Sequence, residues 1–403
     1  MSVVKNRGNE NPPHSSDNNW LSIVACINSG CYDYIGVAIT PWHARMAVAS
    51  YLKLCSENLV KTGILLIDKH NKDGYLAMPE VIAPGLSIAY LKRETGSLIS
   101  MVSAVVCRLA IPRIQKYKTS GRTIYIANPS FPGSIFDSFD ALTIDCRINY
   151  VLLDEGVGSY LSSAEDWANQ SISDRDLHGV VAFARKWLFV YEQNTLPTLI
   201  NALKKQNRFE KYYLFKEDGA LDFRNALFAK NSFELFSNNY DVSFHLINKV
   251  YEGAVVFCSQ YPLVESSLIS LNAYCEAVRA AHEVSKKLKV PFVIKLHPRE
   301  TDRSIYSGFD SFIDSRNDVA LEDILGDLSE PPLCIASLCS TAMITASVVF
   351  NCRGVGLSAL VSNEEQSESL SIFCNRLYSL FGDYFITPST IDGFCSFLKQ
   401  SRN

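Results

Sequence analysis

Two adjacent carboxylates, Asp154 and Glu155, are the side chains best suited to acid–base chemistry, and Gly156 follows them directly. They come after the apolar run 151–153, which is typical of a buried parallel strand. In α/β proteins, ligands lie at the carboxyl ends of such strands, and glycine allows a sharp turn there. A partly desolvated carboxylate in that place has a raised pKa and suits a general base acting on a hydroxyl group. On this stretch alone, a structural Asp154 that caps the following segment is an equally good interpretation.

A second reactive group is His297, at the end of a strand predicted over residues 292–296. Its imidazole can exchange a proton near neutral pH, and Pro298 stops the strand from simply continuing, which helps to fix the approach of the ring. A single histidine is more often structural than catalytic. Whether His297 is catalytic therefore depends on the groups that the fold brings beside it.

Two hydroxyl groups, those of Ser340 and Thr341, stand between a strand predicted over residues 333–336 and an apolar helix that reaches about Val349. The N-terminus of a helix offers unpaired backbone N–H groups and a favourable dipole, so this layout suits a phosphate. Serine and threonine are also ordinary helix caps, which makes the signal weak by itself. In combination with His297, the two hydroxyl groups indicate a phosphate site more strongly.

The elements that carry the carboxylates form a first α/β alternation. A strand is predicted over 35–39, and Thr40 and Pro41 suit the cap and first position of a helix. Gly63 is predicted to end that helix, and a strand over 64–67 follows. Apolar residues at helical spacing support the helix: Ala44, Val48, Leu52, Cys55 and Leu59. Further strands are predicted over 86–90, 123–127 and 150–153, with an apolar helix over 98–109.

A second alternation carries the histidine and the hydroxyl groups. It opens with a strand over 254–258 and continues with a long helix over 263–288. The segment 233–251 is the candidate connection between the two domains. The predicted organisation is a polar, disordered lead over 1–19, a first domain over 20–250 and a second domain over 251–403, whose last helix is able to pack back on the first domain.

Length and composition agree with a folded protein of two domains, since the chain has 403 residues, of which 47% are hydrophobic and 20% charged. A net charge of −4 argues against a protein that binds duplex nucleic acid, because the chain has no basic excess to neutralise phosphates. Twelve cysteines without a CxxC pair or a Cys/His ligand spacing indicate neither a disulfide scaffold nor a zinc site. The sequence shows neither a signal peptide nor an apolar stretch of about 18 residues. These features predict a cytoplasmic protein.

Basic and aromatic residues gather between Asp174 and Glu217 and include Arg185, Lys186 and Trp187. The favoured interpretation is a set of solvated helices with an aromatic inner face. The alternative is a surface that receives an anionic acceptor or an anionic membrane.

In their order and separation, Asp154-Glu155-Gly156, His297-Pro298 and Ser340-Thr341 resemble the three short motifs of bacterial sialyltransferases, including the polysialyltransferases. The opening strand with Thr40-Pro41 resembles the start of the branches that build lipooligosaccharide sialic acid caps and polysialic acid capsules. Segments 211–215 and 255–263 also resemble segments of this family. The resemblance covers most of the chain.

The resemblance implies a GT-B architecture, in which two Rossmann-like domains face each other across a cleft and the second holds most of the sugar nucleotide. It implies transfer of sialic acid from CMP-sialic acid, with inversion and without a metal or another cofactor. The acceptor would be a hydroxyl of a bacterial surface glycan, in capsule polysaccharide or lipooligosaccharide. Contact with the inner face of the cytoplasmic membrane or with capsule-assembly proteins would be peripheral, and nucleic acid is not an expected partner.

The resemblance also implies roles for single residues. Asp154 would deprotonate the acceptor hydroxyl, with Glu155 as its neighbour or, less favoured, as the base itself. His297 would contact the donor phosphate and assist the departure of CMP. The donor-binding residues would be Pro298, Ser340, Thr341 and Lys295, and the candidates for acceptor binding are Arg185, Lys186 and Trp187.

Two other functions stay open at this point. One is a related GT-B transferase that uses CMP-Kdo or a CDP-linked polyol phosphate, because a phosphate site does not identify the sugar. The other is a nucleotide-sugar-binding assembly protein without turnover. The motifs leave the acceptor, the linkage and the choice between single addition and polymerisation unspecified.

Overall fold

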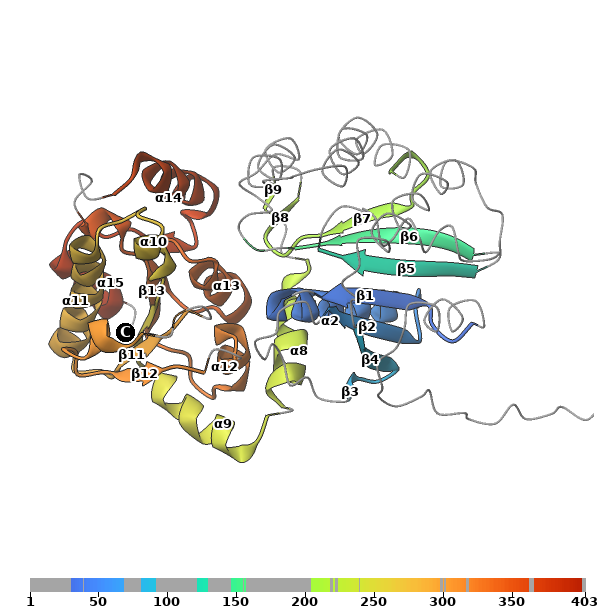
Figure 1. The fold of residues 1–403 in the computed structure, drawn as a ribbon, viewed down its shortest axis with the longest axis horizontal. Coiled ribbons are helices and arrows are strands. Elements are labelled where there is room, and N and C mark those ends of the chain that lie inside the picture. Colours follow the sequence, from blue (N-terminus) through green and yellow to red (C-terminus); the bar gives the residue numbers. More distant parts are fainter. Residues whose placement is uncertain are drawn as a thin grey trace, which may run out of the picture.

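The computed structural model contains two α/β domains, each built on its own sheet (Figure 1). It describes residues 30–38, 40–68, 81–91, 122–129, 146–154, 156, 204–217, 220–221, 224–238, 240–297, 300, 302–316, 319–361 and 366–400. The polar lead 1–19 and the predicted helix 98–109 lie outside these residues.

The first domain has a seven-stranded sheet in the order β3-β4-β2-β1-β5-β6-β7. All neighbouring strands are parallel except β3, which runs antiparallel to β4. The strands are β1 (Tyr34–Ala38), β2 (Gly63–Asp68), β3 (Val81–Ala83), β4 (Leu86–Leu91), β5 (Arg122–Asn128), β6 (Cys146–Leu153) and β7 (Phe209–Tyr212). The last four residues of β6 are all buried, as expected for a strand covered on both faces.

Helix α2 (Pro41–Ser56) begins as predicted, because the Thr40 hydroxyl accepts a hydrogen bond from the His43 backbone N–H at 3.2 Å. The prediction that Gly63 ends this helix is wrong. The helix ends at Ser56, and Gly63 is the first residue of β2. A Cβ atom on Gly63 would lie 2.9 Å from a methyl carbon of Leu86, so glycine is needed here for the close packing of the sheet and not for a helix cap.

The second domain has a six-stranded sheet in the order β12-β11-β10-β13-β14-β15, with all neighbours parallel. The strands are β10 (Val255–Cys258), β11 (Phe292–Lys295), β12 (Phe312–Asp314), β13 (Cys334–Ser337), β14 (Gly354–Gly356) and β15 (Phe385–Ile386). The helices are α10 (Pro262–Glu265), α11 (Leu271–Leu288), α12 (Leu321–Asp327), α13 (Thr341–Phe350), α14 (Glu368–Phe381) and α15 (Ile391–Gln400). Short elements complete the described chain: strands β8 (Lys216–Glu217) and β9 (Ala220–Leu221), and 3₁₀ turns η1 (Lys249–Tyr251), η2 (Ser304–Tyr306) and η3 (Ser358–Leu360).

The long helix predicted over 263–288 is wrong in its first part, because the structure divides it into α10 and α11. Between them Ser267 adopts a left-handed backbone conformation with φ of 57°. The Ser270 hydroxyl then caps α11 by accepting from the Ala273 N–H at 3.0 Å. This cap lies inside a stretch whose apolar spacing is helical throughout, so the periodicity concealed it.

Helices α8 (Ala226–Ser237) and α9 (Val242–Asn248) connect the two domains, and Figure 1 shows α8 between them. On α8, the Phe233 ring lies 5.9 Å from the Trp42 ring of the first domain and 5.8 Å from the Phe350 ring of the second. α8 therefore links the hydrophobic cores of both domains.

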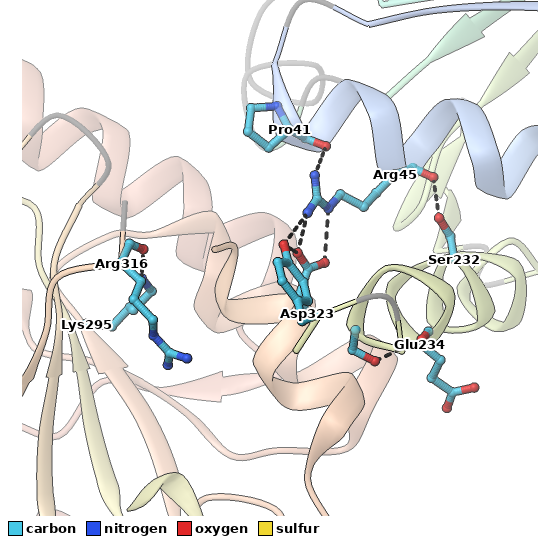
Figure 2. A network of polar contacts seen from close by, with 9 residues as sticks. Pro41, Arg45, Ser232, Glu234, Lys295, Arg316 and Asp323 are labelled. Atoms are coloured by element: carbon cyan, nitrogen blue, oxygen red, sulfur yellow. Dashed lines mark hydrogen bonds and ion pairs between the residues drawn. The ribbon is translucent and has the colours of Figure 1, made fainter. Parts of the chain in front are cut away.

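A buried ion pair joins the two domains beside α8 (Figure 2). Arg45 of α2 donates from Nε to Oδ1 of Asp323 on α12 at 3.0 Å, and both side chains are fully buried. The Tyr240 hydroxyl donates to the other carboxylate oxygen at 3.0 Å. The two mostly parallel sheets, each in its own α/β domain, confirm the predicted GT-B architecture of two Rossmann-like domains.

The last two helices have different partners. Helix α15 packs on α11 within the second domain, where Lys287 and Asp392 form an exposed ion pair at 2.9 Å. The contact with the first domain comes from α14, whose Phe381 ring lies 5.8 Å from the Phe215 ring. None of the described helices combines the length and the apolar character needed to cross a membrane.

Candidate active site

Asp154 follows the last residue of β6 and is fully buried. Its Oδ1 accepts from the Gly156 N–H at 2.5 Å, and its Oδ2 accepts from the Leu214 N–H at 3.0 Å. The indole N–H of Trp42 donates to the Asp154 carbonyl at 3.0 Å. The strand end is therefore held from three directions, by its own turn, by the segment after β7 and by the start of α2.

These contacts are compatible with both interpretations of Asp154, the structural cap and the general base. The bond to the Gly156 N–H is a local side-chain-to-backbone contact of the kind that stabilises turns. The bond to Leu214 holds the carboxylate from a separate element and leaves it in one orientation. Glu155 lies outside the described residues, so the division of roles between the two carboxylates stays a prediction.

The first motif meets the third across the domain boundary. Gly156 has φ of 92°, and a Cβ atom built on it would lie 3.6 Å from Cγ2 and 3.7 Å from Oγ1 of Thr341. The turn after β6 in the first domain and the N-terminus of α13 in the second thus lie close together, since a single added Cβ atom would reach van der Waals contact. The first and third motifs are far apart in the sequence but lie next to each other in the structure.

Ser340 is the N-cap of α13, and its hydroxyl oxygen accepts from the Ala342 N–H at 3.2 Å. Thr341 is the first residue of the helix, and both side chains are half-buried. A hydroxyl that accepts a capping bond still has its O–H to donate. The capping and phosphate-binding interpretations are therefore compatible at this position.

His297 lies just beyond β11 and is half-buried. Its backbone N–H donates to a carboxylate oxygen of Glu300 at 3.4 Å, and its carbonyl accepts from the Glu300 N–H at 2.9 Å. Because β11 and β13 flank β10 and all three are parallel, His297 and Ser340 emerge at the same edge of the second sheet. Pro298 lies outside the described residues.

Lys295 is buried, and Figure 2 shows it beside Arg316. Its ammonium donates to the Arg316 carbonyl at 2.6 Å and lies 4.0 Å from the Asp314 carboxylate. Burial by itself would raise the pKa of Asp314, but hydrogen bonds from Arg316 and the Lys295 charge lower it to about 2. Lys295 thus helps to neutralise a buried carboxylate, and its role in donor binding stays a prediction.

The acceptor-binding candidates Arg185, Lys186 and Trp187 lie outside the described residues. In the described end of that basic segment, the Lys211 ammonium lies 5.4 Å from the centre of the Tyr213 ring. Within the described ranges, His, Cys, Asp and Glu side chains form no group of three or more that could hold a metal ion.

Sequence reasoning missed three groups that shape these strand ends: the Trp42 indole, the Leu214 N–H and the Glu300 carboxylate. Glu300 follows His297-Pro298-Arg299 closely, and a carboxylate so near a candidate catalytic histidine was the available signal. The other two act on Asp154 from distant parts of the chain, and although segment 211–215 resembles the family, nothing in the sequence linked either group to Asp154.

A family model described as alpha-2,8-polysialyltransferase matches residues 37–359, which is most of the chain. No curated protein sequence matches. Several solved structures are similar. A putative UDP-N-acetylglucosamine 2-epimerase from Listeria monocytogenes is 8% identical with a TM-score of 0.45, over 92% of this chain and 88% of that one.

Two sialyltransferase structures are also similar. The enzyme from Photobacterium damsela is 10% identical with a TM-score of 0.40, over 88% of this chain and 81% of that one. The alpha/beta-galactoside alpha-2,3-sialyltransferase from Photobacterium phosphoreum is 11% identical with a TM-score of 0.42, over 88% of this chain and 97% of that one. The family match extends from β1 to the segment after β14 and spans all three motifs. The chain therefore belongs to the alpha-2,8-polysialyltransferase family.

Proposed function

We propose that this protein is an inverting, metal-independent sialyltransferase that moves sialic acid from CMP-sialic acid to a hydroxyl group of a bacterial surface glycan. The observation that supports this most directly is the close approach of Gly156 and Thr341. It brings the candidate base of one domain beside the candidate phosphate site of the other. A transferase needs this arrangement, because the acceptor and the donor must meet between them.

In the proposed reaction, Asp154, or alternatively Glu155, takes the proton of the acceptor hydroxyl. The hydroxyl oxygen attacks the anomeric carbon of sialic acid while the bond from that carbon to the phosphate oxygen of CMP breaks. The electron pair of that bond goes to the phosphate. Attack on the face opposite to CMP inverts the configuration of the anomeric carbon.

The negative charge that develops on CMP would be stabilised by His297, by the Ser340 and Thr341 hydroxyls and by the N-terminus of α13. These hydrogen-bond donors can do what a divalent cation does in other transferases. Turnover should therefore persist in excess EDTA. A complete loss that only magnesium or manganese restores would overturn the metal-independent mechanism.

The donor is tested with a panel that contains CMP-sialic acid, CMP-Kdo and a CDP-linked polyol phosphate, together with capsule and lipooligosaccharide acceptors. We expect acceptor-dependent release of CMP from CMP-sialic acid. Faster release from CMP-Kdo, or release of CMP from the CDP-linked donor, would assign the chain to a related transferase. Tight binding of every donor without release would indicate an assembly protein.

The acceptor and the location are part of the same proposal. Capsule polysaccharide and lipooligosaccharide are both anionic glycans of the bacterial surface, and the family match favours an acceptor that already ends in sialic acid. A cytoplasmic enzyme in peripheral contact with the inner membrane would be released by high salt, because such contact is mainly electrostatic. Release only by detergent would contradict a peripheral contact.

A further inference from the structure

The residues that follow β10, Ser259 and Gln260, lie between the two strand ends that carry the proposed phosphate site. β10 is paired with β11 on one side and with β13 on the other. The Ser259 N–H continues the pairing with β11 by donating to the Lys295 carbonyl at 2.9 Å. Each of the two side chains then turns toward a different neighbour.

Ser259 is buried and belongs to a cluster of hydroxyl groups around Glu300. Its Oγ lies 2.9 Å from the Tyr274 hydroxyl and 2.8 Å from the Tyr306 hydroxyl, and it also donates to Oε2 of Glu300. The Tyr306 hydroxyl donates to Oε1 of Glu300 at 2.7 Å. Burial raises the pKa of the Glu300 carboxyl, and the hydrogen bonds from Ser259 and Tyr306 oppose this rise.

The Glu300 cluster holds the backbone of His297. Both backbone groups of His297 are bonded to Glu300, one to its carboxylate and one to its N–H. Glu300 is only 3% exposed, so its carboxylate cannot exchange these partners for bulk water. The position of His297 is thereby tied to Ser259.

Gln260 holds the other strand end directly. Its side-chain oxygen accepts from the Ser337 hydroxyl at 2.8 Å and from the Cys339 N–H at 2.8 Å. Ser337 is the last residue of β13, and Cys339 directly precedes Ser340. The start of α13 is thereby tied to Gln260.

We propose that Ser259 and Gln260 are positioning residues that set the place of His297 relative to the Ser340-Thr341 end of α13, so that both converge on one phosphate. The inference rests on the proposed function and adds residues outside its three motifs. Neither side chain needs to touch the donor. Each acts through a neighbouring turn, as outer-shell residues do in sites whose geometry must be held closely.

The test compares the affinities for CMP and for cytidine, by calorimetric titration of wild type, Ser259→Ala and Gln260→Leu. Cytidine lacks the phosphate, so misplaced phosphate-binding groups should affect CMP alone. We expect the dissociation constant for CMP to rise by about 10-fold in each variant, within the usual range for loss of an outer-shell partner. The constant for cytidine should change by less than about 2-fold.

Matched controls separate positioning from a general loss of structure. Ser266→Ala removes an exposed serine hydroxyl that donates to carbonyls of its own turn, those of Pro262 and Leu263. Gln366→Leu removes a glutamine that donates to the Ser358 and Val361 carbonyls. Both controls should keep the wild-type ratio of the two dissociation constants, even where the second lowers stability. Ser259→Ala is the mildest change and keeps the test valid if Gln260→Leu does not fold.

Two outcomes would overturn the inference, and they differ in what else they reject. If both variants keep the wild-type ratio while their unfolding midpoints fall, Ser259 and Gln260 stabilise the fold without positioning the site, and the proposed function stands. If the wild type itself binds CMP no better than cytidine, the phosphate site of the proposed function is rejected together with the inference.

Discussion

The Asp154 carboxylate has two tasks, since it accepts two backbone hydrogen bonds and is the proposed base, and two measurements on one variant report on them separately. Asp154→Asn removes the base and turns an acceptor into an N–H₂ group facing a backbone donor. We expect turnover to fall at least 10²-fold. The same change should lower the free energy of unfolding by about 1–3 kcal/mol, while CMP affinity changes little.

Steady-state CMP release and urea unfolding of Asp154→Asn measure the two effects. Asp302→Asn is the control, because Asp302 also accepts a backbone bond, from Ser304 at 2.8 Å, but is exposed. Near-normal turnover of Asp154→Asn with strong impairment of Glu155→Gln would identify Glu155 as the base.

The Ser340 and Thr341 hydroxyls are expected to bind the donor phosphate. Changing both to alanine should weaken CMP binding by about 1–3 kcal/mol, the usual range for hydrogen bonds to a charged group, and leave cytidine binding unchanged. Loss of the Ser340 cap should also cost about 1 kcal/mol of stability. Calorimetric titration with both ligands measures the difference.

Ser367→Ala is the matched control for that experiment, since Ser367 caps α14 by accepting from the Leu370 N–H at 3.2 Å. It should reproduce the loss of stability without the loss of CMP affinity. Equal losses for CMP and cytidine in the double variant, or none for either, would mean that Ser340 and Thr341 only begin the helix.

At the level of elements, the Arg45–Asp323 ion pair holds α2 of the first domain against α12 of the second (Figure 2). The Arg45 guanidinium also lies 4.1 Å from the centre of the Phe236 ring of α8. Removing one partner of such a pair leaves the other charge buried and uncompensated, so Arg45→Met or Asp323→Leu should destabilise the protein by about 3–5 kcal/mol.

The double variant Arg45→Met/Asp323→Leu should recover a large part of that loss, because it leaves no charge behind. Urea unfolding of the two single variants and the double variant measures this coupling. Asp392→Asn, which breaks the exposed pair with Lys287, should change stability little. Strictly additive losses in the double variant would show that the two charges do not stabilise each other.

For the whole molecule, Glu322 makes stability depend on pH. Its side chain is buried beside Asp323. Burial is the main cause that raises its pKa from 4.5 to about 7, and the Asp323 charge adds to this rise, whereas the charges of Arg45 and Lys295 oppose it. Between pH 4.5 and 7 the native state keeps a proton that the unfolded chain releases. The stability from Glu322 is therefore fully present below pH 4.5 and is lost as the pH rises through 7.

Glu322→Gln should remove this dependence. The unfolding free energy of the variant minus that of wild type should therefore increase by about 2–3 kcal/mol from low to high pH. Urea unfolding of both proteins at about pH 5 and pH 8 provides the comparison, with the exposed Glu330→Gln as control. Parallel curves for Glu322→Gln and wild type would show that Glu322 does not keep its proton in the folded protein.

Local chemistry made much of this protein predictable from its sequence. Apolar runs ending in Asp154 and His297 marked two strand ends correctly, because burial on both faces of a parallel sheet requires such runs. Thr40 marked the start of α2 because a capping hydroxyl acts within three residues. The order of the three motifs was enough for the resemblance that the family match supports.

What only the tertiary structure decided depends on residues that are distant in the chain. The local sequence around Gly63 favours a helix end, but in the fold Leu86 and Tyr51 lie against this residue within the sheet. The hydrogen bond from Leu214 to Asp154, the close approach of Gly156 and Thr341, and the Arg45–Asp323 pair all join separate elements or domains. Side-chain periodicity shows which face of an element is buried, but it does not show which element covers that face. The candidate site lies where two domains meet, so its geometry follows from their packing and not from any one stretch of sequence.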